Sequence, residues 1–90
     1  MKRIIYFIEN AYNPEEKLCY RDDSDSLDRH NHSLEEHKGL FIMSNVQMPP
    51  YHLVKFFDEN SASNFLVLAL IKCPQFVMSN LKVSSYIEEL

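Results

Sequence analysis

The sequence predicts a small α+β domain in which an N-terminal antiparallel hairpin packs against two or three C-terminal helices. Three observations indicate this fold class. β-Branched and aromatic residues concentrate near the N-terminus, the C-terminal half has helix-like apolar spacing, and a chain of 90 residues is the length of one domain. We therefore expect residues 1–90 to form a single domain. A sheet of three strands, in which one more strand joins the hairpin, is the alternative to the hairpin alone.

Two short segments predict the N-terminal hairpin. Lys2 to Glu9 are apolar on both faces, which is typical of a central strand covered on both sides. After a turn signal at Asn13-Pro14, Lys17 to Arg21 alternate between apolar and polar side chains, as a half-buried strand does. Two such strands joined by a short loop pair as a hairpin, and Leu40 to Val46 would supply the third strand.

A hydrophilic segment from Asp22 to Lys38, DDSDSLDRHNHSLEEHK, separates the hairpin from the third strand. Only two leucines in it are large and apolar. Ser33 to Glu36 have the form of a capping box, and Gly39, the chain's only glycine, stands where a helix C-cap would. We expect an exposed loop that contains a short helix from about Leu34 to Lys38.

The first C-terminal helix is predicted over Tyr51 to Asn60. It follows Pro49-Pro50, and proline is tolerated in the first turn of a helix. Its apolar residues have the spacing of an amphipathic helix; they are Leu53, Val54, Phe56 and Phe57.

Two further helical segments are predicted after it. The consecutive apolar residues from Phe65 to Ile71 fit either a buried strand or a buried helix, and their leucine and alanine content favours a helix capped by Ser61 or Ser63. Pro74 would end that element. Residues 75–82 and 84–90 are then expected as one kinked helix or two short ones.

Composition and charge narrow the class of function. An apolar content of 46% and an aromatic content of 12% are typical of a globular chain. A net charge of −4 argues against direct binding to nucleic acid, which needs a positive surface, and fits a basic protein partner such as a nucleic-acid-binding enzyme. A partnerless soluble domain would have the same charge.

The apolar runs are short. Phe65 to Ile71 is far below the ~20 residues of a membrane span. The N-terminal run from Ile4 to Ile8 is too short for the core of a signal peptide. We therefore expect no membrane association and a cytoplasmic location, in the source cell or in a host cell.

The hydrophilic segment also carries three histidines that are candidate metal ligands. His30, His32 and His37 lie within eight positions, with Asp28 and Cys19 as further donors. Imidazole and carboxylate are ligands that zinc prefers, but this spacing matches no specific zinc motif. A solvated loop is the simpler interpretation, so we expect no cofactor and retain a zinc site on His30, His32 and His37 as an alternative.

No catalytic pattern emerges from the sequence. Cys19 and Cys73 have apolar or aromatic neighbours, which indicates buried free thiols rather than nucleophiles, with a disulfide between them as the alternative. A single glycine excludes glycine-rich phosphate loops, and no serine stands in a recognisable nucleophile turn. We therefore expect a protein that is not an enzyme.

These observations together predict a small acidic protein that binds and inhibits a protein partner. Anti-defence proteins of phages or mobile elements, toxin-immunity proteins and antitoxins have this character. The expected partner-binding residues are acidic or aromatic: Asp22, Asp23, Asp25, Asp28, Tyr51, Phe56 and Phe57. The alternatives are a metal-binding protein that uses residues 30–37 and a structural homo-oligomer, since the surplus of aromatic residues fits a dimer interface as well as a core.

Overall fold

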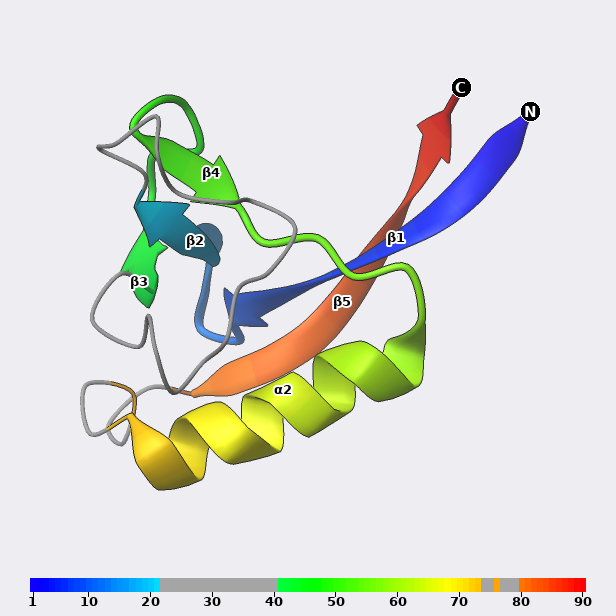
Figure 1. Ribbon diagram of the computed structural model, residues 1–90. Helices are drawn as coiled ribbons and strands as arrows, with labels where there is room; N and C mark the ends of the chain where they lie inside the picture. The colour runs from blue at the N-terminus through cyan, green and yellow to red at the C-terminus, as the bar shows by residue number, and fades with distance from the viewer. Residues whose placement is uncertain (22–40, 74–75, 77–79) are drawn as a thin grey trace, which may run out of the picture.

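The computed structural model describes residues 1–21, 41–73, 76 and 80–90. In these residues five strands form one antiparallel sheet, and one helix packs against it (Figure 1). The strands are β1 (Lys2–Asn10), β2 (Asn13–Arg21), β3 (Phe41–Ser44), β4 (Tyr51–Leu53) and β5 (Leu81–Glu89), and the helix is α2 (Glu59–Lys72).

The sheet has the strand order β3-β2-β1-β5, and β4 also pairs with β2. β1 and β5 pair along their whole length, from Lys2 opposite Glu89 to Asn10 opposite Leu81. The two ends of the chain therefore lie side by side at the tip of a two-stranded ribbon (Figure 1). The N–H of Leu90 closes this tip by donating to the carbonyl of Met1, at 2.8 Å.

β4 pairs with the same edge of β2 as β1 does. β1 occupies this edge close to the β1–β2 turn and β4 occupies it further away, so β4 and the residues after it lie between β1 and β2. β1 and β2 pair close to their turn, with Glu9 opposite Lys17. Further along, β4 pairs with the end of β2. The chain then crosses to β1, where Phe56 and Tyr6 exchange two backbone hydrogen bonds of 2.8 and 2.9 Å.

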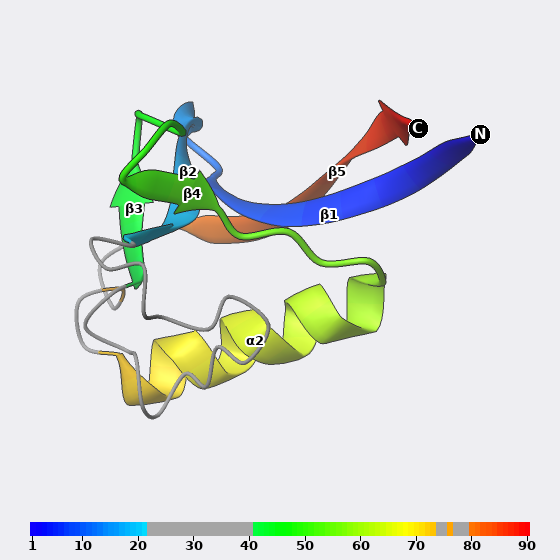
Figure 2. The same cartoon turned by 45° about the horizontal axis from the view of Figure 1, so that its top comes forward.

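Helix α2 covers one face of the sheet (Figure 2). Ala62 and Ala69 are buried on its inner side, where small side chains allow a close approach to the strands. The ring of Phe65 packs edge-on against Phe41, with centroids 5.2 Å apart, and tilted against Phe56 at 5.4 Å. These contacts fix the helix across the middle of the sheet.

The hydrophobic core lies between α2 and the sheet. It draws its buried side chains from three strands, the helix and the segment after the helix: Ile8, Leu18, Tyr20, Phe41, Ala69, Cys73 and Phe76. Burying a large apolar side chain stabilises a fold by about 1.5–3 kcal/mol, so this cluster supplies the main stabilising term.

The predicted hairpin, the third strand and the helix over residues 65–71 are confirmed, with shifted boundaries. β2 already begins at Asn13, so the turn is at Ala11 and Tyr12 and the Asn13-Pro14 pair lies inside the strand. Helix α2 begins after Asp58 rather than at a serine cap. The short helix expected over residues 34–38 lies outside the described residues.

The prediction of two or three C-terminal helices packed on the hairpin is wrong. The structure is a five-stranded antiparallel sheet with one helix among its described residues. The segment predicted as a helix over Tyr51 to Asn60 forms β4 and extended chain up to the start of α2. Residues 81–89, predicted as helical, form β5.

Both errors have a physical cause. Val54 and Phe56 pack against the core while Lys55 and Phe57 are exposed, so this segment alternates as a strand, although its apolar spacing also fits a helix. β5 is held by its pairing with β1, and that pairing joins residues from the two ends of the chain. A local sequence pattern does not contain this long-range contact.

No helix in the described ranges is long and apolar enough to cross a membrane.

Candidate functional site

The face of the sheet opposite α2, which we call the open face, carries the structure's main group of charged and aromatic side chains. Alternate residues of β1 point to this face, because side chains alternate along a strand. The residues directly across on β5 do the same. The members from the two strands are Arg3, Ile5, Phe7, Glu9, Lys82, Ser84, Tyr86 and Glu88. Ile5, Phe7 and Glu9 are buried among them, so the accessible part of this face is formed by the other members.

Arg3 organises the end of the open face near the chain termini. Its Nε donates to a carboxylate oxygen of Glu88 at 2.8 Å, and its guanidinium lies 4.7 Å from the centroid of the Phe57 ring. Lys55 Nζ lies 3.7 Å from the other carboxylate oxygen of Glu88. The hydrogen bond from Arg3 holds the pKa of Glu88 below its ordinary value, and the charges of Arg3 and Lys55 act in the same direction.

Phe57 is the most exposed aromatic side chain of the open face. It is 65% exposed, although it neighbours Phe56, which packs into the core. Tyr86 is also exposed on this face and lies 5.8 Å from the buried Phe7, centroid to centroid. The open face therefore offers two aromatic surfaces to a binding partner.

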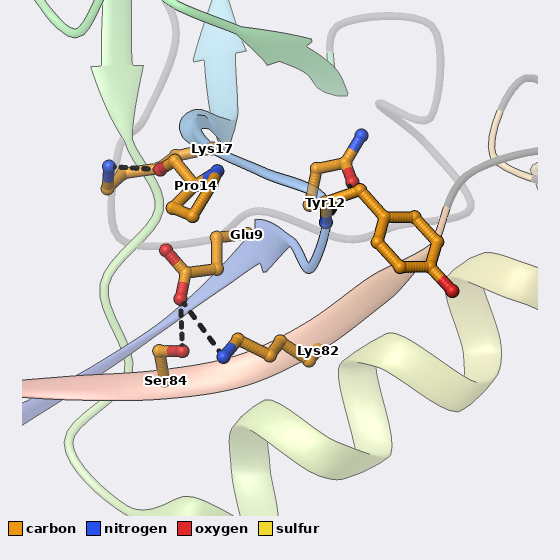
Figure 3. A network of polar contacts seen from close by, with 7 residues as sticks. Glu9, Tyr12, Pro14, Lys17, Lys82 and Ser84 are labelled. Carbon is orange, nitrogen blue, oxygen red and sulfur yellow. Dashed lines mark hydrogen bonds and ion pairs between the residues drawn. The ribbon is translucent and has the colours of Figure 1, made fainter.

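A second polar cluster lies at the other end of the open face (Figure 3). Glu9 is the buried charged residue of the described part of the chain, and its carboxylate accepts a short hydrogen bond from the Ser84 hydroxyl. Lys82 Nζ lies 3.7 Å from the same oxygen. Across the hairpin Lys17 turns its ammonium group to the carbonyl of Pro14, at 2.6 Å. These contacts fix Glu9 and Lys82 in place.

The chemistry of the open face suits recognition. Its carboxylates are already held by cationic partners, so the side chains are ordered before any ligand arrives. Its aromatic rings and guanidinium can contact a protein surface by apolar, cation–π and charge-assisted interactions.

The structure separates the aromatic residues that the sequence grouped together. Tyr51 lies in β4, half-buried, with the guanidinium of Arg21 5.7 Å from its ring centroid. Phe56 packs against the core and Phe57 lies on the open face. The predicted binding residues Asp22, Asp23, Asp25 and Asp28 lie outside the described residues.

The histidines of the alternative zinc site, His30, His32 and His37, also lie outside the described residues. Within the part of the chain that the structure describes, no three His, Cys, Asp or Glu side chains are grouped so that they could hold a metal ion. The zinc alternative stays a prediction.

Sequence reasoning missed the partners of Phe57 on this face. Arg3, Tyr86 and Glu88 come from the two chain ends, and the last two were assigned to a helix. A period of two along Lys82 to Glu88 was the available signal, because it separates these charged ends and Tyr86 from Val83 and Ile87. Arg3 to Glu9 gave no such signal, since that segment is apolar on both faces.

Comparisons of the chain with protein-family models, curated proteins and solved structures found no match. The open face and the charge pattern of the sequence are therefore the features that bear on function.

Proposed function

We propose that the protein is a non-enzymatic domain that binds and inhibits a protein partner, with the open face as its binding surface. The observation that carries this proposal is the exposed Phe57 held by Arg3 on the same face as Tyr86. Tyrosine and arginine are enriched among the residues that dominate binding energy at protein interfaces, and aromatic residues in general are enriched in interfaces.

The arrangement of Arg3 favours this use. Its guanidinium contacts both the Phe57 ring and the Glu88 carboxylate, so its side chain is held before a partner binds. A side chain that is already ordered loses less conformational entropy on binding. Burial of an exposed phenylalanine then contributes about 1.5–3 kcal/mol.

The charge pattern supports a basic partner. Residues 22–40 contain six of the chain's 13 acidic residues but only two of its nine Lys and Arg residues. The remaining residues are balanced, with seven of each sign, so the net charge of −4 belongs to this segment. A concentrated charge steers association with an oppositely charged protein, such as a nucleic-acid-binding enzyme in the cytoplasm of the source or host cell.

The first test replaces Phe57 by serine. We expect Phe57→Ser to weaken partner binding on the order of tenfold or more, because it removes the most exposed aromatic side chain of the proposed surface. Binding is measured by titrating the immobilised chain with its purified target. Ile71→Ser is the matched control, since Ile71 is 73% exposed on α2, away from the open face.

Equal loss of binding in both variants, or loss in Ile71→Ser alone, would remove the open face from the interface. Far-UV circular dichroism checks that each variant keeps its sheet and helix.

The second test neutralises the acidic segment by changing Asp22, Asp23, Asp25 and Asp28 to asparagine. We expect a slower association rate and a weaker salt dependence, because charge acts mainly on the encounter step. The control changes four carboxylates elsewhere to glutamine: Glu15, Glu16, Glu59 and Glu89. If this control slows association as much as the aspartate variant does, only net charge matters and the segment has no specific role.

A further inference from the structure

The outer edge of β5 presents, in a regular pattern, backbone groups that pair with no other described strand. Two hydrogen bonds, Leu90 N–H to Met1 O at 2.8 Å and Ala11 N–H to Asn80 O at 2.7 Å, define which residues of β5 bond to β1. In an antiparallel pair these residues alternate, so even-numbered residues face β1. The residues whose N–H and C=O groups point outward are Leu81, Val83, Ser85, Ile87 and Glu89.

In the described part of the chain, the middle of this edge lacks the usual devices against strand pairing. Natural edge strands are protected by charges, prolines, bulges or a covering element. The central residues Val83 to Ile87 include no charge and no proline, and β5 follows β1 without a register shift through all nine pairs. Among the described residues no strand pairs with the outer edge.

We propose that a second copy of this chain pairs with the β5 edge, antiparallel and centred on Ser85, so that one sheet runs through both copies. In this register all nine residues of β5 find a partner. The outward-pointing residues form the hydrogen-bonded pairs, with Val83 opposite Ile87 and Ser85 opposite Ser85 of the second copy. The proposal is independent of the proposed inhibitory function.

The charges of the open face match in this register. Lys82 stands opposite Glu88 of the second copy, in a non-hydrogen-bonded pair where side chains approach most closely. Within each copy Glu9 is opposite Lys82 and Arg3 is opposite Glu88. A row across four strands therefore alternates in sign, from Glu9 through Lys82 to Glu88 and Arg3 of the second copy, and the two-fold axis repeats it.

The apolar residues of the other face match as well. Ile8 is opposite Val83, and Ile4 is opposite Ile87, within each copy. The Ser85-centred register joins these pairs into one apolar row across four strands. Ile4 and Ile87, which are 49% and 67% exposed in a single copy, would gain neighbours in this row.

The neighbouring registers lose the charge match. The nearest alternative registers that keep the same β5 residues facing the second copy place the two-fold axis at Ser84 or at Tyr86 in place of Ser85. The first places Lys82 opposite Tyr86, and the second places Glu88 opposite Ser84. Lys82 therefore stands opposite Glu88 of the second copy only in the Ser85-centred register. A generic edge contact would not produce this charge match.

The test measures the mass of the full chain in solution as a function of concentration, together with amide hydrogen exchange along β5. We expect a monomer–dimer equilibrium. As the dimer forms, exchange should slow at the outward N–H groups of Val83, Ser85 and Ile87, while the inward N–H groups of Ser84 and Tyr86 should already be slow in the monomer. A chain that stays monomeric at its highest attainable concentration overturns the proposal, as does a dimer without this new protection.

Charge reversal tests the register. Lys82→Glu and Glu88→Lys should each weaken the dimer on the order of tenfold, because like charges then face each other at two symmetric positions. The double variant restores the Lys–Glu pairs between the copies and should dimerise more tightly than either single variant, because each like-charge pair that it keeps within a copy, with Glu9 or with Arg3, is already present in one of the single variants. Lys82 and Glu88 of one chain lie about 20 Å apart along the strand, so recovery cannot come from a contact within one copy. Failure of the double variant to recover rejects this register.

A pair of proline variants separates loss of the dimer from loss of the fold. Ser85→Pro removes an outward N–H and should give a folded monomer, because proline is tolerated where the strand edge is free. Ser84→Pro removes an N–H that bonds to β1 and should destabilise the monomer itself. A folded Ser85→Pro variant that still dimerises as wild type does would contradict pairing through this edge.

Discussion

Cys19 shows how burial determines the chemistry of one residue. It lies on β2, has no exposed surface and is not joined to Cys73, so the expectation of buried free thiols is confirmed. Burial raises the pKa of Cys19 from 9.0 to about 11, and the nearby charge of Lys17 opposes this shift more weakly. The thiol therefore stays protonated and unreactive at neutral pH.

This pKa predicts a stability change at alkaline pH. The unfolded thiol releases its proton near pH 9 but the folded thiol only near pH 11, so the free energy of unfolding should fall as the pH rises between these values. Below about pH 9 the contribution should be constant. Urea unfolding of the wild type and of Cys19→Ala over this range gives the measurement, and parallel profiles for the two proteins would contradict it.

Helix α2 depends on Asp58 at its N-terminus. The side chain of Asp58 accepts from the Ser61 N–H at 2.8 Å and from the Ser61 hydroxyl at 2.6 Å. These hydrogen bonds favour the carboxylate and lower the pKa of Asp58 below 3.8. The cap satisfies donors that the first helical turn cannot satisfy itself, and the negative charge suits the helix N-terminus.

The cap predicts different behaviour for two substitutions. Asp58→Asn should keep the midpoint of thermal unfolding near the wild-type value at pH 7, since asparagine is an equally good cap, while Asp58→Ala should lower it. The folded pKa of Asp58 is lowered, so its charge contributes above the unfolded pKa, and this contribution is lost as the pH falls through the folded value. The wild type should therefore lose stability relative to Asp58→Asn only below about pH 3.8. A constant difference between the two proteins from pH 7 to pH 3 would contradict this role.

The elements differ in how far the sequence determines them. β1 and α2 could be predicted because their apolar content is continuous and local. β5 could not, because its residues become a strand only through pairing with the other end of the chain. The helix start was placed at a serine, although Asp58 provides the stronger N-terminal signal with its side-chain bond to Ser61.

The candidate site was predictable only in part. Phe57 was chosen from the sequence as an aromatic residue on an amphipathic helix. In the structure its segment is strand-like, so neighbouring side chains point to opposite sides: Phe56 packs against the core and Phe57 is exposed. Arg3 and Glu88 are separated by almost the whole chain, so nothing local in the sequence joins them. The predicted acidic and histidine residues lie outside the described part of the chain and stay predictions.

At the scale of the whole molecule, the two faces of the sheet differ in what they contact and what they expose. The face covered by α2 holds the main core cluster. On the open face Ile5, Phe7 and Glu9 are buried too, while Arg3, Phe57 and Tyr86 present charge and exposed aromatic rings. Pairing of two copies through β5 would double the open face without covering it, since the sheet grows sideways. An inhibitor built this way would engage its target with two copies of one surface and gain from bivalent binding.

The most direct test of the proposed function is native mass spectrometry of the complex captured by the tagged chain from its source or host cell, with Phe57→Ser and Ile71→Ser captured in parallel. We predict one protein partner in fixed stoichiometry, retained by the wild type and by Ile71→Ser and lost by Phe57→Ser. A partner that Phe57→Ser retains in full, or a wild-type chain that is captured without any partner, would contradict a protein-binding role for the open face.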